Sequence, residues 1–509
     1  MGLPVITSSR IYRGQIEKLL SDQVSFSFEN YPYVALAKTY SVDVHTTDSA
    51  SSGTAFLSGI KAQMATIGVG PQVKRGDCLA SLRHQVDSLA VAAIKQSKWS
   101  GFVTNTRVTH ATPASLYAHS ADRDWESNKY MINVTHGHNC KDIATQLVEN
   151  FPGSSLRVIM GGGRKHFIPD TERDPEYTEL FGQRTDNKNL INLWKNKPHR
   201  KFVWNRQQLM ELQTGSSDFI MGLFEPNHMA YAYEHKITNR TDDPSLSEMT
   251  RKAIEHLSRN PEGYFLLVEG GRIDHALHDN RAKLTFEEVV EFDKAIDLAR
   301  KLTSRDDTLI VVTADHSHSM SQIGYPYRNT SILGTFYGQD HNDGLPSTLI
   351  IFADGPGAFV NGTGRQNLTG VDTEDYKFRQ PSLIPGLDDS HAGEDVAVYA
   401  DGPFAHVFTG LIEQHTIAHV IQYALCIGTA REKCLRDQEE IRLSDKEDTP
   451  TPSNGLLITA VIFAVLSFIL LLLIAALFGV QVRQFVKRNK VDSDTSNINL
   501  AGIPNANTV

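Results

Sequence analysis

The chain has 509 residues, of which 40% are hydrophobic and 21% are charged, a composition that is ordinary for a globular protein with one large or two modest cores. Its 59 acidic and 50 basic residues give a net charge of −9, and the pI is near 6.1. This balance argues against a basic binding surface, so no nucleic-acid partner is expected.

The first residues do not have the pattern of an export signal. Met1 to Thr7 lacks a charged region and an apolar core of the kind that a signal peptide needs. Residues 8–22 then predict a helix with a polar face.

Apolar and often β-branched runs recur along the chain. Several are continuous and not alternating, which is typical of strands buried on both faces. These runs cover residues 33–42, 101–104, 156–160, 264–268, 309–313, 348–352 and 396–399. Helical periodicity lies between them over residues 86–94 and 286–302, and a capping box from Ser245 to Glu248 opens another helix. The alternation predicts a three-layer α/β/α sandwich around a central, mostly parallel sheet.

Residues 324–390 interrupt this rhythm, because Gly, Pro, Asn and Asp are frequent there and only one strand is convincing. We interpret them as an inserted surface subdomain. Five N-x-S/T sequons are candidate glycosylation sites, and three of them fall in this region: Asn133, Asn239, Asn329, Asn361 and Asn367.

The end of the chain predicts a membrane anchor. No charged residue occurs from Leu456 to Val480, about 25 residues, which is enough to cross a hydrocarbon core of ~30 Å. We divide the chain into an ectodomain (1–442), a polar stalk (443–454), a transmembrane helix (455–482) and a cytoplasmic tail (483–509). Basic residues directly after the span place the tail inside by the positive-inside rule. The prediction is a single-pass type I protein of the plasma membrane with an extracellular domain; a buried core helix and a lipid-anchor signal are the disfavoured alternatives.

The four cysteines form one wide pair and one close pair in the sequence. None belongs to a CxxC motif, so a zinc–thiolate site is not expected. In an oxidising compartment the natural pairing is Cys78–Cys140 and Cys426–Cys434, although four cysteines allow three pairings.

Groups of carboxylate and imidazole side chains follow the predicted strands. They comprise Glu269 with Asp274, His275 and His278, then Asp315, His316 and His318, and then His391. Ser49 lies where an apolar run gives way to small residues that can open a helix, a place that suits an anion. Because open parallel sheets gather ligands at the carboxyl ends of their strands, these groups are expected to converge on a multi-metal hydrolytic site.

These motifs together resemble those of animal alkaline phosphatases over essentially the whole ectodomain. They are Asp48-Ser49-Ala50, Thr106 to Ala111, Val268 to His275, Thr313 to His318 and His391 to Val396. The resemblance implies that Ser49 is the nucleophile of a phosphomonoesterase and forms a phosphoserine, with Arg123 clamping the phosphate and Asp48 holding Arg123. It also implies three metal sites: zinc 1 held by Asp274, His278 and His391, zinc 2 by Asp315, His316 and Ser49, and magnesium by Glu269 and Thr112. His110, His275 and His318 are expected to support these ligands without binding metal themselves.

The same family suggests a further cation site and a dimer. A calcium-like site would use Glu176, Phe224 through its carbonyl, Glu225 and Asp243. Similar proteins are homodimers in which a tyrosine at the start of the inserted region reaches the partner's site, and Tyr325 matches it.

One departure from the family concerns the start of the chain. Met1-Gly2 aligns with the second half of a Gly-Asp-Gly-Met-Gly motif whose aspartate bridges zinc 2 and magnesium, so that carboxylate and the strand before it are absent. We therefore expect an N-terminally truncated form that lacks an inner strand and has lost much or all of its activity. The alternatives are a catalytically inactive ectodomain with a binding role, and a phosphodiesterase or sulfatase of the same superfold.

Overall fold

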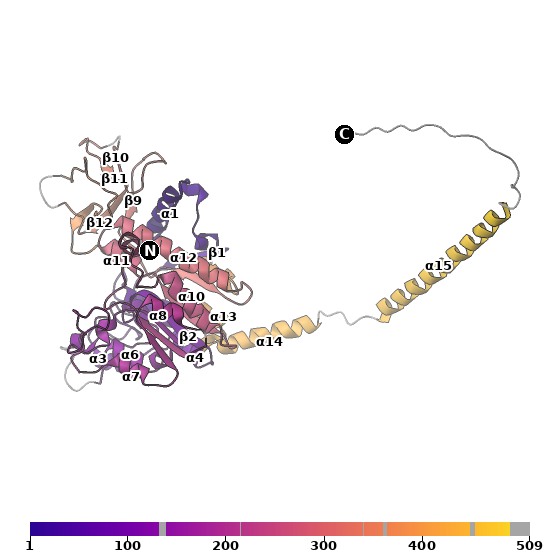
Figure 1. Cartoon of the computed structure of the whole chain (residues 1–509), viewed down its shortest axis with the longest axis horizontal. Coiled ribbons are helices and arrows are strands. Elements are labelled where there is room, and N and C mark those ends of the chain that lie inside the picture. Colours follow the sequence, from indigo (N-terminus) through magenta and orange to yellow (C-terminus); the bar gives the residue numbers. More distant parts are fainter. Residues whose placement is uncertain (132–138, 214, 339–340, 360–363, 448–453, 489–509) are drawn as a thin grey trace. The chain divides into compact units, whose positions relative to one another are not determined.

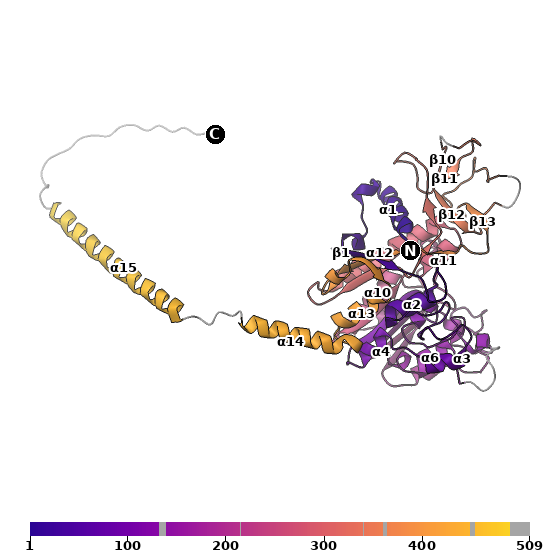
Figure 2. The same cartoon turned by 180° about the vertical axis from the view of Figure 1, so that it is seen from behind.

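The computed structural model describes residues 1–131, 139–213, 215–338, 341–359, 364–447 and 454–488. The chain divides into two compact units, residues 1–435 and residues 436–509. The first unit contains the sheets, and Figures 1 and 2 show it from two opposite sides.

One sheet of the first unit is entirely parallel. Its five strands, in spatial order, are β4 (Arg200–Val203), β5 (Phe219–Leu223), β3 (Val158–Gly162), β2 (Trp99–Arg107) and β6 (Tyr264–Glu269). Strand β2 lies between β3 and β6 and is buried along most of its length. The register pairs Thr104 of β2 with Glu269 of β6, so both residues lie at the carboxyl edge of the sheet.

A second sheet is mixed. Its four strands, in spatial order, are β16 (Gly410–Glu413), β1 (Tyr33–Lys38), β15 (Val396–Asp401) and β7 (Ile310–Thr313). Strand β15 runs antiparallel to both β1 and β7, whereas β1 and β16 are parallel. The predicted central parallel sheet is therefore present as the five-stranded sheet, and the mixed sheet extends the α/β architecture.

The helices of the first unit cover these sheets on both sides. Their bounds are α1 (Leu3–Glu17), α2 (Ser49–Ser58), α3 (Cys78–Arg83), α4 (Leu89–Ile94), α5 (Ala111–Ala114), α6 (Ile143–Glu149), α7 (Leu190–Lys195), α8 (Arg206–Glu211), α9 (Ala232–Thr238), α10 (Leu246–Leu257), α11 (Arg272–His278), α12 (Ala282–Leu302) and α13 (Thr416–Ala424). Consecutive residues of β2 show the layering. Phe102 belongs to a buried cluster with α4, α6 and α7, and Val103 belongs to a cluster with α8 and α10. Alternate side chains of a strand point to opposite faces, so the three-layer prediction is confirmed.

The predicted boundaries needed correction at both ends of the first helix. Helix α1 begins at Leu3, because Pro4 is tolerated in the first helical turn, and it ends at Glu17, where Lys18 takes a left-handed conformation. The prediction of residues 8–22 was therefore shifted along the chain. The capping box is confirmed, because the Ser245 hydroxyl accepts from the Glu248 N–H and the Glu248 carboxylate accepts from the Ser245 N–H.

Short strands within and directly before the inserted region group at one end of the unit, away from α3, α6 and α7 (Figure 1). They are β9 (Ser321–Gln322), β10 (Thr335–Phe336), β11 (Ser347–Thr348), β12 (Ile350–Gly355) and β13 (Ser382–Pro385). The six-residue β12 is the predicted strand, and it pairs with β9 and β13. Two further short strands, β8 (Ser317–His318) and β14 (His391–Ala392), pair antiparallel beside the ends of β7 and β15.

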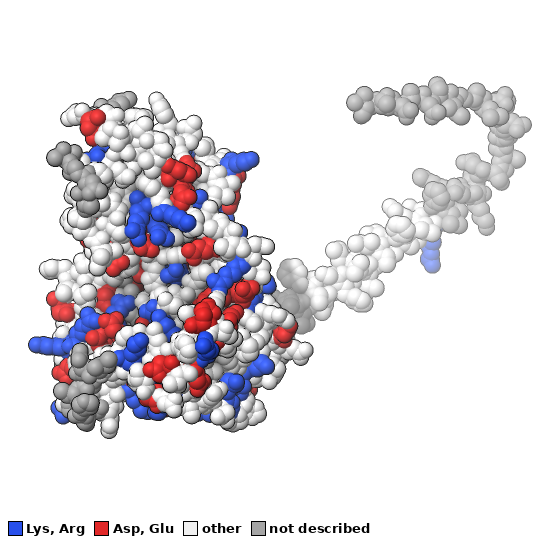
Figure 3. All heavy atoms as spheres, turned by 60° about the vertical axis from the view of Figure 1, so that its left-hand side comes forward, with Lys and Arg blue, Asp and Glu red and all other residues white. Residues whose placement is uncertain are grey.

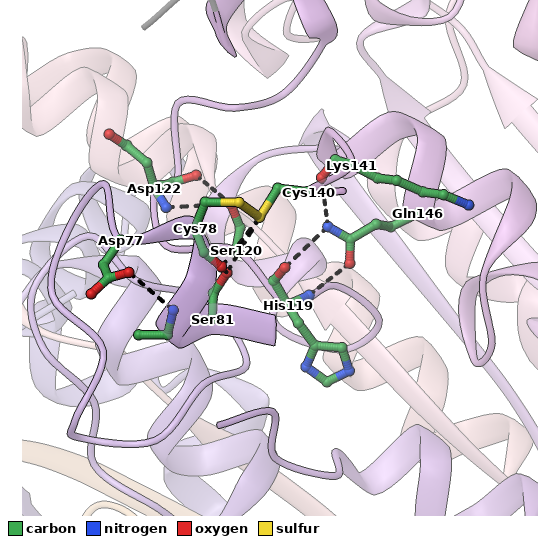
Figure 4. The surroundings of a disulfide bond; sticks show 10 residues. Asp77, Cys78, Ser81, His119, Ser120, Asp122, Cys140, Lys141 and Gln146 are labelled. Carbon is green, nitrogen blue, oxygen red and sulfur yellow. Dashed lines mark hydrogen bonds between the residues drawn. A yellow bond between two sulfur atoms is a disulfide. The ribbon is translucent and has the colours of Figure 1, made fainter. Parts of the chain in front are cut away.

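Both predicted disulfide bonds are formed. Cys78 at the start of α3 bonds to Cys140, and Cys426 bonds to Cys434. Figure 4 shows that the Cys78–Cys140 bond lies beside the segment that leads to Arg123. Close by, Gln146 accepts from the His119 N–H at 2.9 Å and donates to the His119 carbonyl at 3.1 Å. The disulfide therefore braces the backbone on which the predicted phosphate clamp is mounted.

Two helices follow α13, α14 (Arg431–Glu447) and α15 (Asn454–Arg488). Among the residues that the structure describes, one helical segment, Thr459–Gln484, is long and apolar enough to cross a membrane. Its apolar side chains are exposed in the chain by itself. Helix α14 extends into the predicted polar stalk, and residues 448–453 of that stalk lie outside the described part.

We predict that the two disulfides differ in their effect on stability. Replacing Cys78 and Cys140 together by Ser opens a loop of 62 residues and should lower the free energy of unfolding by about 4 kcal/mol, whereas removing Cys426–Cys434, separated by 8 residues, should cost about 2 to 3 kcal/mol. Urea denaturation of the two double variants under non-reducing conditions measures this difference. An equal or reversed order would contradict the loop-entropy explanation.

Candidate metal centre and active site

The candidate nucleophile lies at the start of a buried helix. Ser49 is the first residue of α2, and Asp48 caps that helix by accepting from the Ser51 N–H at 3.2 Å. The Ser49 Oγ lies 3.2 Å from Nε2 of His316. The positive end of α2 and the neighbouring imidazole therefore both face the serine hydroxyl, an arrangement that suits an anionic group.

Asp48 also positions the predicted phosphate clamp. Its Oδ2 accepts from Nη1 of Arg123 at 2.9 Å, while its Oδ1 accepts from the Ala65 N–H at 3.0 Å. Burial favours the neutral acid, but Arg123 and these backbone donors hold the pKa of Asp48 below its ordinary value. The ionised carboxylate thus fixes Nη1 of the guanidinium, while Nη2 lies 3.4 Å from Nε2 of His110.

The three predicted acid-and-imidazole groups come together in the structure. On α11, Nε2 of His278 lies 3.5 Å from Oδ2 of Asp274, as expected for residues four apart on one helix. Nε2 of His391 on β14 lies 3.2 Å from Nε2 of His278 and 3.6 Å from Oδ1 of Asp274. Side chains from α11 and from β14 therefore lie close together.

The third group lies directly after β7. Oδ2 of Asp315 is 3.0 Å from Nε2 of His316, and the rings of His316 and His391 stack with centroids 3.5 Å apart. Four potential ligand atoms, one from each of Asp274, His316, His318 and His391, lie within 4.8 Å of one another. Such a set of convergent oxygen and nitrogen donors fits divalent cations of the zinc class.

The protonation states also fit metal ligands. Burial opposes ionisation of Asp274 and Asp315, but neighbouring imidazoles hold the pKa of each carboxyl below its ordinary value. Burial, assisted by His316, lowers the pKa of His391 to about 3. The group therefore presents ionised carboxylates and a neutral imidazole, the forms in which these side chains bind metal.

His318 acts between two carboxylates, one of which was not predicted from the sequence. Its Nε2 lies 2.6 Å from Asp274 and its Nδ1 lies 2.8 Å from Asp389. Burial lowers the pKa of His318, but the two carboxylates outweigh it and raise the pKa. Asp389 also accepts, through its carbonyl, from Nδ1 of His278 at 2.6 Å. An acid two residues before His391 was the available signal, and its role is to orient two imidazoles.

Glu269 is the last residue of β6, and threonine hydroxyl groups hydrogen-bond to its carboxylate. Its Oε2 accepts from Thr104 at 2.5 Å and from Thr106 at 3.2 Å, and Thr112 on α5 also hydrogen-bonds to it. Burial raises the pKa of Glu269 from 4.5 to about 7 despite these hydroxyl donors. Carboxylate and hydroxyl oxygens together are ligands for a hard cation such as magnesium.

A second group of three imidazoles adjoins this centre. The ring of His228 lies 4.2 Å from that of His275 and 5.3 Å from that of His110, between centroids. His228 was missed from the sequence, where it stands in a turn without any motif. Its Nδ1 accepts from the Arg107 N–H at 3.2 Å and its Nε2 contacts the Arg107 guanidinium, so N–H donors already face both ring nitrogens. We therefore interpret the group as support for the neighbouring ligands.

A pocket opens beside these ligands. It has a volume of about 340 Å³ and is lined by Tyr231, Arg272, His275, His278, Asp279 and Asp388. The pocket borders His278 directly, so the non-reacting part of a ligand held at Ser49 has space there. Figure 3 shows acidic and basic side chains interspersed over one face of the molecule, without a broad field of one sign.

The predicted calcium-like residues also gather. Tyr177 donates to Oε1 of Glu225 at 2.9 Å, and Glu176 lies 3.1 Å from the Arg164 guanidinium. Both carboxylate oxygens of Asp243 are buried without a hydrogen-bond partner. Burial, with Asp243 as the main neighbour, raises the pKa of Glu225, which indicates uncompensated negative charge. Phe224 is buried and directly follows β5 in the sequence, next to Glu225.

The remaining predicted residues lie on the surface or outside the described part. Tyr325 is 95% exposed. Three sequon asparagines are exposed, namely Asn239, Asn329 and Asn367. Asn133 and Asn361 lie outside the described residues.

Comparisons with known proteins point to one family. A family model described as alkaline phosphatase matches residues 1–427. The tissue-nonspecific alkaline phosphatase of Homo sapiens is 43% identical over 441 residues, covering 85% of this chain and 83% of that protein. The membrane-bound alkaline phosphatase of Bombyx mori is 40% identical over 445 residues, covering 86% and 80%.

Solved structures share the fold at lower identity. Alkaline phosphatase from the Antarctic bacterium TAB5 is 23% identical with a TM-score of 0.57, covering 84% of this chain and 96% of that one. The enzyme of Thermus thermophilus is 21% identical with a TM-score of 0.59, covering 86% and 93%.

We predict that Glu269 destabilises the metal-stripped protein at high pH. Because its pKa is about 7 when folded and 4.5 ordinarily, the folded state binds the proton more tightly, and stability is lost as the pH rises from about 4.5 to about 7. Glu269→Gln cannot ionise, so the stripped variant should have a higher Tm than the stripped parent at pH 8 and a nearly equal Tm at pH 5.

Calorimetry of both proteins after treatment with a chelator measures this. The metal-loaded pair is the control, and there the order should reverse because the variant has lost a ligand. A Tm difference that does not change with pH would contradict the burial of an ionisable Glu269.

Proposed function

The chain belongs to the alkaline phosphatase family of phosphomonoesterases, and we propose that it acts through a phosphoserine on Ser49 at a site for two zinc ions and one magnesium ion. The observation that carries this proposal is the position of Ser49. Its Oγ lies 3.2 Å from Nε2 of His316, while Arg123 is held nearby through Asp48. A nucleophile, a residue that can hold phosphate and a group of candidate ligands thus come from five separate stretches of the chain, and this supports the proposal.

We assign each metal ion to a group of residues by the type of donor atom that the group offers. Zinc 1 would be held by Asp274, His278 and His391; zinc 2 by Asp315, His316 and Ser49; magnesium by Glu269 and Thr112. The convergence of ionised carboxylates and a neutral imidazole fits zinc, and the oxygen-only set around Glu269 fits magnesium. A variant of the TAB5 alkaline phosphatase is described with magnesium bound in its M3 site. When bound, such cations stabilise negative charge on phosphoryl oxygens and favour deprotonation of a hydroxyl nucleophile.

The side chains of the chain itself supply the remaining chemistry. The Ser49 hydroxyl loses its proton to solvent and its Oγ attacks phosphorus; the ester P–O bond breaks, and the departing alkoxide takes up a proton from solvent to leave as the alcohol. Arg123 holds two equatorial phosphoryl oxygens through its planar guanidinium, which keeps the nucleophile and the leaving oxygen in line. A water then attacks the phosphoserine from the side that the alcohol has left, and cleavage of the Oγ–P bond releases phosphate and restores Ser49.

Two further features are proposed from the family and from the exposed surface. The apolar segment Thr459–Gln484 would anchor the protein in the plasma membrane as a single-pass type I protein, with the catalytic unit outside. The 95% exposed Tyr325 would contact the partner of a homodimer. A large aromatic side chain that is free of its own chain is a typical interface anchor.

We also propose that the group of Glu176, Glu225 and Asp243 binds calcium, with the Phe224 carbonyl as an additional ligand. The carboxylate oxygens of Asp243 accept no hydrogen bond, although Oδ2 lies 3.7 Å from Nη2 of Arg240 and 3.9 Å from Nε2 of His235. This and the raised pKa of Glu225 support the proposal, because a hard cation would reduce the repulsion. Arg240 contacts Glu225 and compensates only part of this charge.

The proposed nucleophile is tested by trapping the intermediate. Ser49→Ala should abolish incorporation of phosphate into the protein and should lower kcat/KM for a chromogenic phosphomonoester by on the order of 10³-fold or more. The measurement is intact-protein mass spectrometry after acid quenching. Ser52→Ala is the matched control, because its hydroxyl donates to the Asp48 carbonyl at 2.7 Å in the same helix and is not expected to accept phosphate. Normal phosphate incorporation in Ser49→Ala would refute the assignment.

The proposed calcium site is tested by thermal stability. Calcium at about 100 times its dissociation constant should stabilise the parent by about 2.7 kcal/mol and raise its Tm, and Asp243→Asn should remove most of that rise. Asp242→Asn is the control, because this neighbouring carboxylate is exposed. If both variants respond to calcium like the parent, Asp243 is not a ligand.

A further inference from the structure

A second pocket shares no lining residue with the pocket beside His278. It has a volume of about 560 Å³. Its lining residues come from α9, the turn that follows it and two tyrosine-bearing segments: Tyr177, Ala230, Glu234, Ile237, Thr238, Asn239, Arg240, Asp242 and Tyr376. Aromatic rings, hydroxyl and carboxylate groups therefore surround one open space, and a sequon asparagine stands among them.

Asn239 is placed where an oligosaccharide can be attached. It is exposed and ends α9 in a left-handed conformation with φ of 50°. Its N–H donates to the His235 carbonyl and closes the helix, so its side chain is not needed for the cap. Thr241, the third residue of the sequon, is exposed as well. Exposure of the asparagine and of the third residue of a sequon in a turn is the usual condition for N-glycosylation.

The two tyrosines are held in place by their neighbours. The Tyr177 hydroxyl donates to Glu225, and the Arg240 guanidinium lies 5.7 Å from the centre of its ring. The ring of Tyr376 packs 5.4 Å from that of Tyr233, which is itself covered by the Lys283 ammonium at 4.8 Å. Both aromatic side chains thus reach the pocket from ordered surroundings.

This lining has the chemistry of a sugar site. The C–H groups on one face of a pyranose ring carry partial positive charge and pack against the negative face of an aromatic ring. The hydroxyl and acetamido groups at the ring edge need hydrogen-bond partners, which Thr238, Glu234 and Asp242 provide. Aromatic walls with a few polar groups are the usual composition of a small-molecule pocket.

We propose that the pocket binds the first sugars of an N-linked glycan attached to Asn239. The glycan then lies against Tyr376 and Ile237 and does not project freely into solvent. Since Arg240 follows Asn239 directly and contacts Glu225, the packed glycan also restrains the turn beside the carboxylates Glu225 and Asp243. The inference does not depend on phosphate hydrolysis, and it gives the other two described sequons a contrasting role.

Asn329 and Asn367 provide internal controls. Both are exposed, and neither lines this pocket or the pocket beside His278. Glycans on these two residues should therefore be freely accessible, whereas the glycan on Asn239 should be protected.

The test is site-resolved deglycosylation of the full chain, produced in a secretory eukaryotic host. A glycan amidase is added to the native protein, and mass spectrometry of peptides follows the conversion of each asparagine to aspartate with time. Each rate is divided by the rate at the same site in denatured protein, which corrects for sequence preference. We expect this ratio to be at least about 10-fold lower at Asn239 than at Asn329 and Asn367.

Variants of the pocket decide whether the lining causes the protection. Tyr376→Ala and, independently, Ile237→Ala should raise the ratio at Asn239 toward that of the other two sites. Tyr337→Ala, which removes another exposed aromatic ring outside the pocket, should leave it unchanged. An unmodified Asn239, a ratio at Asn239 equal to that at the control sites, or protection that survives both pocket variants would overturn the proposal.

Discussion

The structure depends on a group of carboxylates that lie close together at and beyond the carboxyl ends of strands β6 and β7. Asp274, Asp315 and Glu269 come from different elements and end in the same interior volume, where repulsion between like charges is weakly screened. Imidazoles compensate the first two acids, and burial drives the third toward its neutral form. Divalent cations bound at the proposed sites would relieve this repulsion.

The sequence predicted the layered α/β fold and the convergence of Ser49, Asp274, His316 and His391 because both follow from local patterns. Continuous apolar runs mark strands buried on two faces, and residues directly after such runs reach the same edge of a sheet. Short strands were harder to predict from the sequence. Strands β8 and β14 have two residues each and no hydrophobic period, yet their pairing brings His318 opposite His391. Such contacts depend on long-range packing that no local pattern records.

The sequence identified the residues that orient the proposed metal ligands less well than it identified the ligands themselves. Asp389 sits in an Asp-Asp-Ser turn that reads as an ordinary loop, and only the fold shows that it holds both His318 and His278. His228 follows β5 in a turn, and only the approach of α11 and α5 places it against His275 and His110. The predicted boundaries of α1 were wrong for a simpler reason. Proline at the start of α1 and left-handed Lys18 after it shift the helix by several residues from its polar periodicity.

Two of the proposed metal ligands lie at the junction between the two sheets. Strands β6 and β7 each end a sheet, and both remain half-exposed although their sequences are strongly apolar. No ladder of hydrogen bonds joins them among the described strands, so their relative position rests on side chains that pack into shared clusters. Glu269 ends one strand and Asp315 follows the other, and their charges repel across this junction. Cations bound between these acids would turn the repulsion into a link between the sheets, so metal binding and the spacing of the two sheets must be coupled.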